Sequence, residues 1–439
     1  MVSTEPSPNV LLVVLDSVRA QNCSLYGHRN RTTPFLESLA SDATVYTQAR
    51  APSNWSLPSH VSLFTGIEAH AHKVTVHDRL QPDTTIFESL ADQEYGTGLF
   101  SENGFLTSHE TGLKNAFETV VGVPDQYDAQ FDTTSLNPAP DGFYFADAFD
   151  SWRADQTGQW AACVNLMDAH RPFEPREAYD QWGHDYCRTV QADLPTRWEW
   201  AFYGDDRPYW QLQALEQLYD GGIRQADAVL ERIVTSLRES GELDETLLVV
   251  CGDHGDGFGE TGKLAAEPPA VSHIIPMSES LLHVPLVVRP PGGGNGDRCH
   301  HPAALTAFPD VVRTYVDGTP NRAGFARQQV VATKQPVTDD LRQRYEDHCA
   351  DPEPFLRSSQ AVYVDSPTDG DSIRKQYYWG EQAAERRITS PHDSVEIGDI
   401  TPHRVKNAFD DAEADVRLPL SGQQVTADAK EQLAALGYY

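Results

Sequence analysis

Lysine and methionine are scarce in this chain of 439 residues, which has seven lysines and three methionines against 65 Asp and Glu residues. The formal net charge is −31. A nucleic-acid-binding surface needs clustered Lys and Arg to neutralise phosphates, and no such cluster occurs here. The composition therefore excludes an ordinary nucleic-acid partner.

Paired cysteines and long apolar runs are also missing. The six cysteines form no C-x-x-C pair and no metal-ligand spacing, which favours buried thiols in a reducing compartment over a disulfide framework. The first apolar run covers only residues 10–15, and no later run reaches the length of a membrane span. We therefore expect a cytoplasmic protein without a membrane-spanning segment.

The acidic excess is spread along the whole chain rather than gathered in one block. Self-repulsion of such a surface is silenced in molar salt, where the Debye length is about 3 Å. This pattern predicts adaptation to a salty solvent, and the alternative is an acidic face for a cationic partner.

Hydrophobic residues nevertheless make up 39% of the chain and aromatic residues 10%, which indicates a folded globule. Short continuous apolar runs are typical of strands buried on both faces of a parallel sheet; they cover residues 10–15, 98–100, 160–167, 247–251 and 284–288. Helical patterns over residues 34–43, 210–240 and 303–316 lie between or after them. The alternation predicts an α/β fold with a doubly wound, mostly parallel sheet flanked by helices.

The chain loses the buried-strand pattern from about residue 318 onward. We therefore predict a catalytic domain over residues 8–317 and a smaller α+β subdomain over residues 318–439, which ends in a helix near residues 426–436. Residues 124–150 and 174–210 are expected to form surface excursions, and either could form a lid over the site.

Ligands of doubly wound sheets bind at the carboxyl ends of the strands. Asp16, Asp168, Asp253 and His254 directly follow three of the predicted strands. Asp253 and His254 open a glycine-rich turn, and together with Asp16 they would suit a divalent cation. The open coordination position would go to the Ser56 oxygen or to a substrate oxygen. A simple capped turn is the alternative.

Residues 54–66 contain a second candidate. Ser56 fits the N-cap of a short helix, Pro58 fits its first turn and Gly66 fits its end. A hydroxyl at that position is exposed to the positive end of the helix dipole, which favours a deprotonated nucleophile. His60 lies four residues on, on the same helical face as Ser56. The alternative is a capping serine with an unrelated histidine.

Three further histidines, His170, His273 and His283, could converge on a pocket. There they would bind an anionic ester oxygen or protonate a leaving group. Taken singly, each also fits a surface or core position.

Several motifs in order resemble the sulfatase family of the alkaline phosphatase superfamily, in a salt-adapted archaeal form. They cover residues 8–20, 23–27, 33–40, 56–66, 252–260 and 283–288. The resemblance implies an alkaline phosphatase-like fold, with Asp16, Asp253, His254 and Ser56 around one metal ion. It also implies that Ser56 is the nucleophile and that His170 and His273 contact the ester or its leaving group.

In sulfatases the nucleophile is a formylglycine made from Cys or Ser in a Cys/Ser-x-Pro/Ala-x-Arg context. Here His60 stands in place of that Arg, Ser17 in place of a second metal-binding Asp, and residues 101–104 in place of a Gly-Lys-Trp-His block. These departures resemble relatives such as phosphonate hydrolases and phosphoglycerol transferases, which use an unmodified Ser or Thr on phosphate esters. The cation would be Ca2+ or Mn2+, and the imidazole ligand favours Mn2+.

Taken together, these patterns predict a metal-dependent hydrolase of a small anionic ester, of sulfate in the first instance. Ser56, His60, His170 and His273 are the catalytic candidates. Two alternatives stay open: a phosphoester or phosphonate hydrolase or phosphotransferase with unmodified Ser56, and a non-catalytic relative stabilised by its metal. The organic half of the substrate and the oligomeric state are left open.

Overall fold

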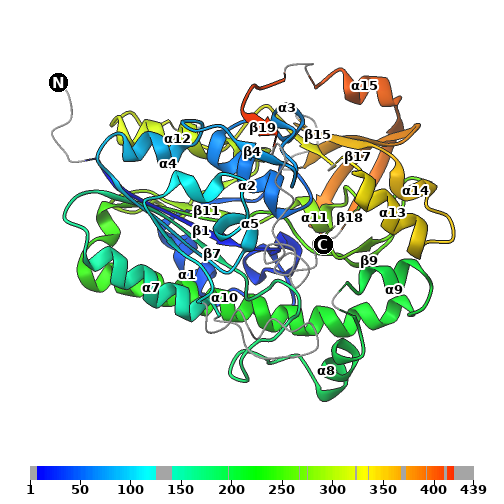
Figure 1. The fold of residues 1–439 in the computed structure, drawn as a ribbon, viewed down its shortest axis with the longest axis horizontal. Coiled ribbons are helices and arrows are strands. Elements are labelled where there is room, and N and C mark those ends of the chain that lie inside the picture. The colour runs from blue at the N-terminus through cyan, green and yellow to red at the C-terminus, as the bar shows by residue number, and fades with distance from the viewer. Residues whose placement is uncertain are drawn as a thin grey trace.

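An eight-stranded sheet forms the centre of the molecule in this computed structural model (Figure 1), with strand order β12-β2-β11-β8-β1-β7-β5-β6. The structure describes residues 7–419 except 125–140, 196, 266, 274, 322–323, 335, 367–371, 392 and 410–412. The strands are β1 (Asn9–Leu15), β2 (Thr44–Tyr46), β5 (Gly96–Ser101), β6 (Thr119–Val121), β7 (Trp160–Leu166), β8 (Thr246–Gly252), β11 (Leu286–Arg289) and β12 (Arg298–Cys299).

The five strands predicted from apolar runs all lie in this sheet. β8, β1, β7, β5 and β6 pair in parallel, whereas β11 runs antiparallel to both β8 and β2. Every residue of β1, β7 and β8 is buried, because helices cover both faces of the sheet. The mostly parallel α/β fold is confirmed.

Alternate residues of β1 show how the helices are divided between the faces. Val10, Leu12 and Val14 pack with α2 (Ser56–Thr65), α4 (Ile86–Ala91) and α12 (Phe308–Val316). Leu11, Val13 and Leu15 pack with α1 (Pro34–Leu39), α7 (Gly142–Ala154) and the long α10 (Leu212–Ser240). Figure 1 shows the first group above the sheet and the second below it.

A second sheet follows in the C-terminal part and lies beside the first (Figure 1, orange). It is antiparallel throughout, in the order β14-β15-β16-β17-β18. Its elements are β14 (Gln329–Thr333), α13 (Asp339–His348), α14 (Glu353–Leu356), β15 (Ser359–Asp365), β16 (Ile373–Trp379), β17 (Gln382–Ser390), β18 (Asp393–Asp399) and α15 (Pro402–Lys406). The expected smaller α+β subdomain is therefore present as an antiparallel sheet with helices.

Short elements complete the described chain. They are β3 (Ala49–Arg50), α3 (Ala69–His72), β4 (Asp78–Leu80), α5 (Gly104–Thr107), α8 (Asp185–Ala192), α9 (Glu199–Tyr203), β9 (Phe258–Glu260), β10 (Ala270–Val271), α11 (Glu279–Leu282), β13 (Ala303–Ala304) and β19 (Arg417–Pro419). No described helix combines the length and the apolarity that a membrane crossing needs.

Two element predictions need correction. Residues 303–304 pair with β3 as the strand β13, so the helix expected from residue 303 begins only at Phe308. Residues 142–150 were expected in a surface excursion, but they belong to α7, because Phe145 and Phe149 supply an apolar face that packs on the sheet. Residues 125–140 and the helix predicted near 426–436 lie outside the described residues.

Candidate active site

Two strand ends bring three potential metal ligands together. β1 and β8 are parallel neighbours in which Leu15 pairs with Gly252, so Asp16 and Asp253 leave the sheet side by side. Asp16, Asp253 and His254 each offer a ligand atom, and these atoms all lie within 4.8 Å of one another. All three side chains are fully buried.

Amide side chains from two other strand ends hold Asp16. Its Oδ2 accepts a hydrogen bond from Asn103 Nδ2 at 2.9 Å and another from Asn165 Nδ2 at 3.2 Å. Asn165 lies within β7, and Asn103 lies just after β5 as the N-cap of α5. Four strands of the central sheet therefore contribute polar groups to one place.

The other two ligands are oriented by the backbone. Asp253 Oδ1 accepts from the backbone N–H groups of Ser17, at 3.1 Å, and of His254, at 2.9 Å. Ser17 has a left-handed backbone (φ 61°), and this turn directs its N–H group toward Asp253. His254 Nδ1 lies 2.8 Å from the Gly255 carbonyl oxygen. Donation of a proton there leaves the lone pair on Nε2 for a ligand.

The electrostatics of this cluster suit a cation. Burial and the neighbouring Asp16 carboxylate raise the pKa of Asp253. Burial also opposes ionisation of Asp16, but the imidazoles of His170 and His254 outweigh it and lower its pKa. Asp253 Oδ2 is buried and has no hydrogen-bond partner among the described residues. An ionised carboxylate oxygen in that state is costly unless a positive charge approaches it, so these residues fit a divalent cation.

Ser56 faces this cluster from the start of α2. Its Oγ lies 3.0 Å from His254 Nε2, and the side chain is fully buried. The predicted N-cap role is wrong: Trp55, with extended backbone, is the N-cap, and Ser56 is the first residue of the helix. Gly66 ends the helix in the left-handed conformation, as predicted.

His60 lies one turn along α2, and it is also fully buried. Its Nδ1 lies 2.9 Å from the Ser56 carbonyl oxygen and 3.6 Å from Asp253 Oδ2. The predicted proximity to Ser56 is therefore observed at the main chain. His60 links the first turn of the helix to a carboxylate of the metal-ligand cluster.

His170 and His273 lie beside His254. The ring centroid of His273 is 4.8 Å from that of His254 and 5.3 Å from that of His170. His170 Nδ1 lies 2.7 Å from the Arg171 carbonyl oxygen, and His273 Nδ1 lies 3.6 Å from Asp256 Oδ1. Burial lowers the pKa of both imidazoles, so each is neutral near pH 7.

Two other candidates from the sequence have different surroundings. Asp168 follows β7, but its Oδ1 accepts hydrogen bonds from Gln225 Nε2 and the Gly142 N–H group, which tie it to α10 and α7. His283 Nε2 lies 2.9 Å from the Thr47 carbonyl oxygen. Neither residue belongs to the three-ligand cluster.

Comparison with known proteins now gives this site a family. A sequence model of the family described as Sulfatase matches residues 8–317. The chain belongs to the sulfatase family. The match covers the central sheet and all the candidate site residues.

Individual relatives of this sulfatase-family chain are distant. It is 24% identical to Arylsulfatase A of Homo sapiens over 279 residues, which cover 56% of this chain and 52% of the human protein. The chain thus matches about half the length of that relative. It is 26% identical to Arylsulfatase K of Danio rerio over 395 residues, 80% of this chain and 71% of that protein.

Among solved structures, the chain resembles the phosphonate monoester hydrolase of Agrobacterium radiobacter with a TM-score of 0.61. The sequence identity is 18%, and the similarity covers 87% of this chain and 89% of the other. At that identity the likeness shows the fold, which is alkaline phosphatase-like.

Asn103 and Asn165, which hold Asp16, were not among the predicted site residues. Asn103 lies in residues 101–104, the segment that departs from the sulfatase pattern, so the departure itself marked the position. Asn165 is the polar residue inside an otherwise apolar buried strand. Such a residue must find a polar partner, and that was the available signal.

Proposed function

We propose that this sulfatase-family protein is a divalent-metal-dependent hydrolase of sulfate esters with Ser56 at the nucleophile position. One observation carries the proposal: the buried cluster of Asp16, Asp253 and His254 faces Ser56 Oγ, which is 3.0 Å from His254 Nε2. A purely structural metal site would not need a hydroxyl at the start of a helix.

Asp16, Asp253, His254 and Ser56 Oγ would hold the cation, which is Ca2+ or Mn2+ in this proposal. When bound, it supplies positive charge that favours a deprotonated Ser56 oxygen and an anionic ester group beside it. Ser56 is the first residue of α2, so its hydroxyl also lies at the positive end of the helix dipole, which favours negative charge there.

His170 and His273 would act on the leaving group. Both imidazoles are neutral in the free protein because burial lowers their pKa. A negative ester group placed beside them raises the pKa again, so substrate binding and protonation are linked. One of the two then donates a proton to the departing oxygen.

Hydrolysis of phosphate or phosphonate esters, or phosphoryl transfer, by unmodified Ser56 is the second candidate. His60 favours it, because this residue fills the position at which conversion of serine to formylglycine calls for Arg. Its imidazole is also bound to the Ser56 carbonyl oxygen and faces Asp253.

The deciding experiment combines the mass of the Ser56 peptide with a substrate panel. Aryl sulfates, phosphates and phosphonates are assayed with Mn2+, Ca2+ and Mg2+, and Ser56→Ala is compared with Ser59→Ala. Ser59 is a matched control, since it is buried in the same helix and its hydroxyl donates to the Ser53 carbonyl oxygen.

Sulfate release that Ser56→Ala abolishes and Ser59→Ala retains is the expected result. An unmodified serine with activity on phosphate or phosphonate esters alone would transfer the proposal to phosphoryl chemistry. Metal-dependent melting without turnover of any ester would identify a non-catalytic relative.

We also propose that the chain is cytoplasmic and salt-adapted, as its net charge of −31 suggests. An anionic substrate must approach an acidic surface, and salt screens that repulsion. Activity should therefore rise as salt is added, and a steady fall toward molar salt would contradict this part of the proposal.

A further inference from the structure

Two arginines share one buried carboxylate next to the histidines of the site. Glu199, at the start of α9, is fully buried. One oxygen pairs with Arg171 Nη1, and the other accepts from Arg197 Nε at 2.6 Å. In a chain with a net charge of −31, this arrangement concentrates positive charge at one place.

The charges of this group do not cancel. Burial opposes ionisation of Glu199, but Arg171 and Arg197 outweigh burial and lower its pKa to about 2. One carboxylate therefore faces two guanidinium groups. Arg344, on α13 of the C-terminal subdomain, adds a third positive charge. Burial lowers the pKa of Arg197, and the charges of Arg171 and Arg344 lower it further. The excess is at least one positive charge.

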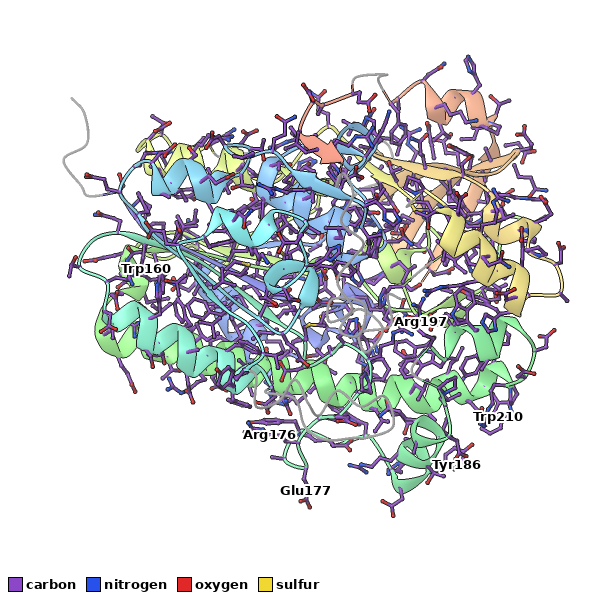
Figure 2. The ribbon with its side chains drawn as sticks, in the orientation of Figure 1. Trp160, Arg176, Glu177, Tyr186, Arg197 and Trp210 are labelled. Atoms are coloured by element: carbon purple, nitrogen blue, oxygen red, sulfur yellow. The ribbon has the colours of Figure 1, made fainter. Side chains whose placement is uncertain are left out.

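The group lies on the side of the site that holds the proposed leaving-group histidines. Arg171 directly follows His170, whose Nδ1 contacts the Arg171 carbonyl oxygen. The charge of Arg171 acts on both Asp256 and His273. Burial raises the pKa of Asp256, and Arg171 offsets part of that rise. Burial lowers the pKa of His273, and Arg171 lowers it further. Figure 2 shows Arg197 toward the middle of the molecule, whereas Tyr186 and Trp210 lie at its rim.

Arg197 has hydrogen-bonding capacity to spare. Its Nη1 is buried and has no hydrogen-bond partner among the described residues, although 15% of the side chain is exposed. A buried donor without an acceptor is costly, and a ligand that supplies one recovers the cost. A planar guanidinium edge matches the oxygen pair of a carboxylate, sulfate or phosphate group.

We propose that Arg197 binds an anionic group in the organic half of the substrate, so that the substrate is an ester with a second negative charge. Glu199 and Arg171 act as positioning residues: Glu199 accepts from Arg197 Nε and pairs with Arg171, which directly follows His170. The inference rests on the proposed function, and it adds the chemical class of the leaving group to it.

The test compares matched esters with and without the second charge. Phenyl sulfate is paired with 4-carboxyphenyl sulfate and with phenyl 1,4-disulfate, and the corresponding phosphates are run in parallel. The variants are Arg197→Gln and Arg197→Lys, and Arg188→Gln is the control. Arg188 lies on α8, with 49% of its side chain exposed and its guanidinium paired with Asp180.

The protein should prefer the doubly charged ester by about tenfold or more in kcat/KM, the size expected for one charge-assisted pair. Arg197→Gln should remove that preference, Arg197→Lys should keep part of it, and Arg188→Gln should keep all of it. The carboxylate and the sulfate arms show which anion is bound. Equal losses on singly and doubly charged esters in Arg197→Gln would overturn the proposal.

A binding measurement separates this inference from the proposed function. The probe is 4-sulfobenzoate, followed by the shift in melting temperature of the metal-loaded protein. A shift that Arg197→Gln halves or abolishes supports the anion site even if no ester is turned over, a result that would count against the proposed function alone. An equal shift in both proteins overturns the anion site whatever the activity.

Discussion

The two sheets of this molecule place their polar residues differently. In the central sheet β1, β7 and β8 are buried along their whole length, so polar side chains gather where the strands end. In the C-terminal sheet β18 is largely exposed: the exposed fraction is 45% for Val395 and 43% for Ile397. A sheet covered on both faces concentrates its chemistry at one edge, whereas a half-solvated sheet spreads its charges over a face.

One buried ion cluster connects the two sheets. Lys375, on β16, donates to the Met277 carbonyl oxygen and lies 3.0 Å from Glu279 Oε1. Glu279, on α11, also pairs with Arg50 at 2.9 Å. The C-terminal sheet thus supports the segment between His273 and His283 without contributing any of the predicted site residues.

The largest effect is expected at the edge of the central sheet. Asp253→Asn removes a proposed metal ligand, and it should lower activity by about 1000-fold or more. The metal-free variant should melt no lower than the metal-free parent, because burial and Asp16 already disfavour the Asp253 charge and raise its pKa. Turnover and melting curves with and without chelator measure both effects.

Asp393→Asn on exposed β18 is the control for that experiment. It should change neither activity nor melting. A strong loss of stability in metal-free Asp253→Asn would show that the strand-end carboxylate is structural, and the contrast between the two sheets would lose its functional meaning.

The second effect concerns the buried ion cluster that connects the two sheets. Lys375→Met leaves Glu279 with one cation fewer at a buried site, and it should cost about 3 kcal/mol in the free energy of unfolding. The active-site residues stay in place, so the remaining folded protein should keep its turnover number. Urea denaturation followed by two probes, with Lys406→Met on α15 as an exposed control, measures the cost.

If Lys375→Met stayed within 0.5 kcal/mol of the parent, a threshold typical of surface substitutions, the two sheets would be coupled by packing alone. Loss of turnover without loss of stability would instead indicate that the ion cluster positions the segment carrying His273.

The third effect is a pH dependence of the free energy of unfolding that originates at one lysine of the C-terminal subdomain. Lys334 Nζ donates to the carbonyl oxygens of Phe355 and Arg357, and burial lowers its pKa to about 7. Between pH 7 and about 10 the unfolded chain holds this proton more tightly than the folded chain does. The free energy of unfolding should therefore rise with pH over that window, by about 1 kcal/mol or more.

Lys334→Met lacks the titrating amine. The difference in free energy of unfolding between this variant and the parent should therefore change with pH only between pH 7 and about 10. Urea melts at pH 6, 7, 8 and 9 provide the comparison. Parallel pH profiles of the two proteins would mean that the carbonyl acceptors keep Lys334 charged in the folded state.

The smallest effect is expected on exposed β18, and the same substitution in buried β1 provides the comparison. Val395→Thr on β18 should change stability by less than about 0.5 kcal/mol, because the side chain is 45% exposed. Val13→Thr in the fully buried β1 should cost about 2 kcal/mol, because it places a hydroxyl inside the apolar cluster that Val13 joins. Equal losses of stability at both positions would mean that the exposed and the buried sheet tolerate a hydroxyl equally well.

The residues at the strand ends show how far sequence reasoning reaches. Asp16, Asp253 and His254 were predictable, because an apolar run buried on both faces must end in polar residues at the same edge. Ser56 was predicted to be the N-cap, but Trp55 holds that position. The exact first residue of a helix depends on backbone angles, which composition does not determine.

Long-range partners were beyond sequence reasoning. Asn103 and Asn165 meet Asp16 only because β5 and β7 lie beside β1, and the order of strands in a sheet is not written in any single run. The same holds for Glu199, which pairs with Arg171, a residue 28 positions away in the chain, and joins it to Arg197.

The position of β1 between β7 and β8 also bears on how the chain folds. Asn9 pairs with Thr246, and Val10 pairs with Ala161. β1 can therefore complete its hydrogen bonds to both neighbouring strands only after β8 has been synthesised. Contacts of such high sequence separation slow folding and leave unpaired strand edges exposed meanwhile. On the ribosome, a chain that ends before Thr246 holds Asp16 but neither of its partner ligands. The ligand set can therefore form only after His254 has been synthesised, and slow synthesis would prolong the interval in which β1 is open to aggregation.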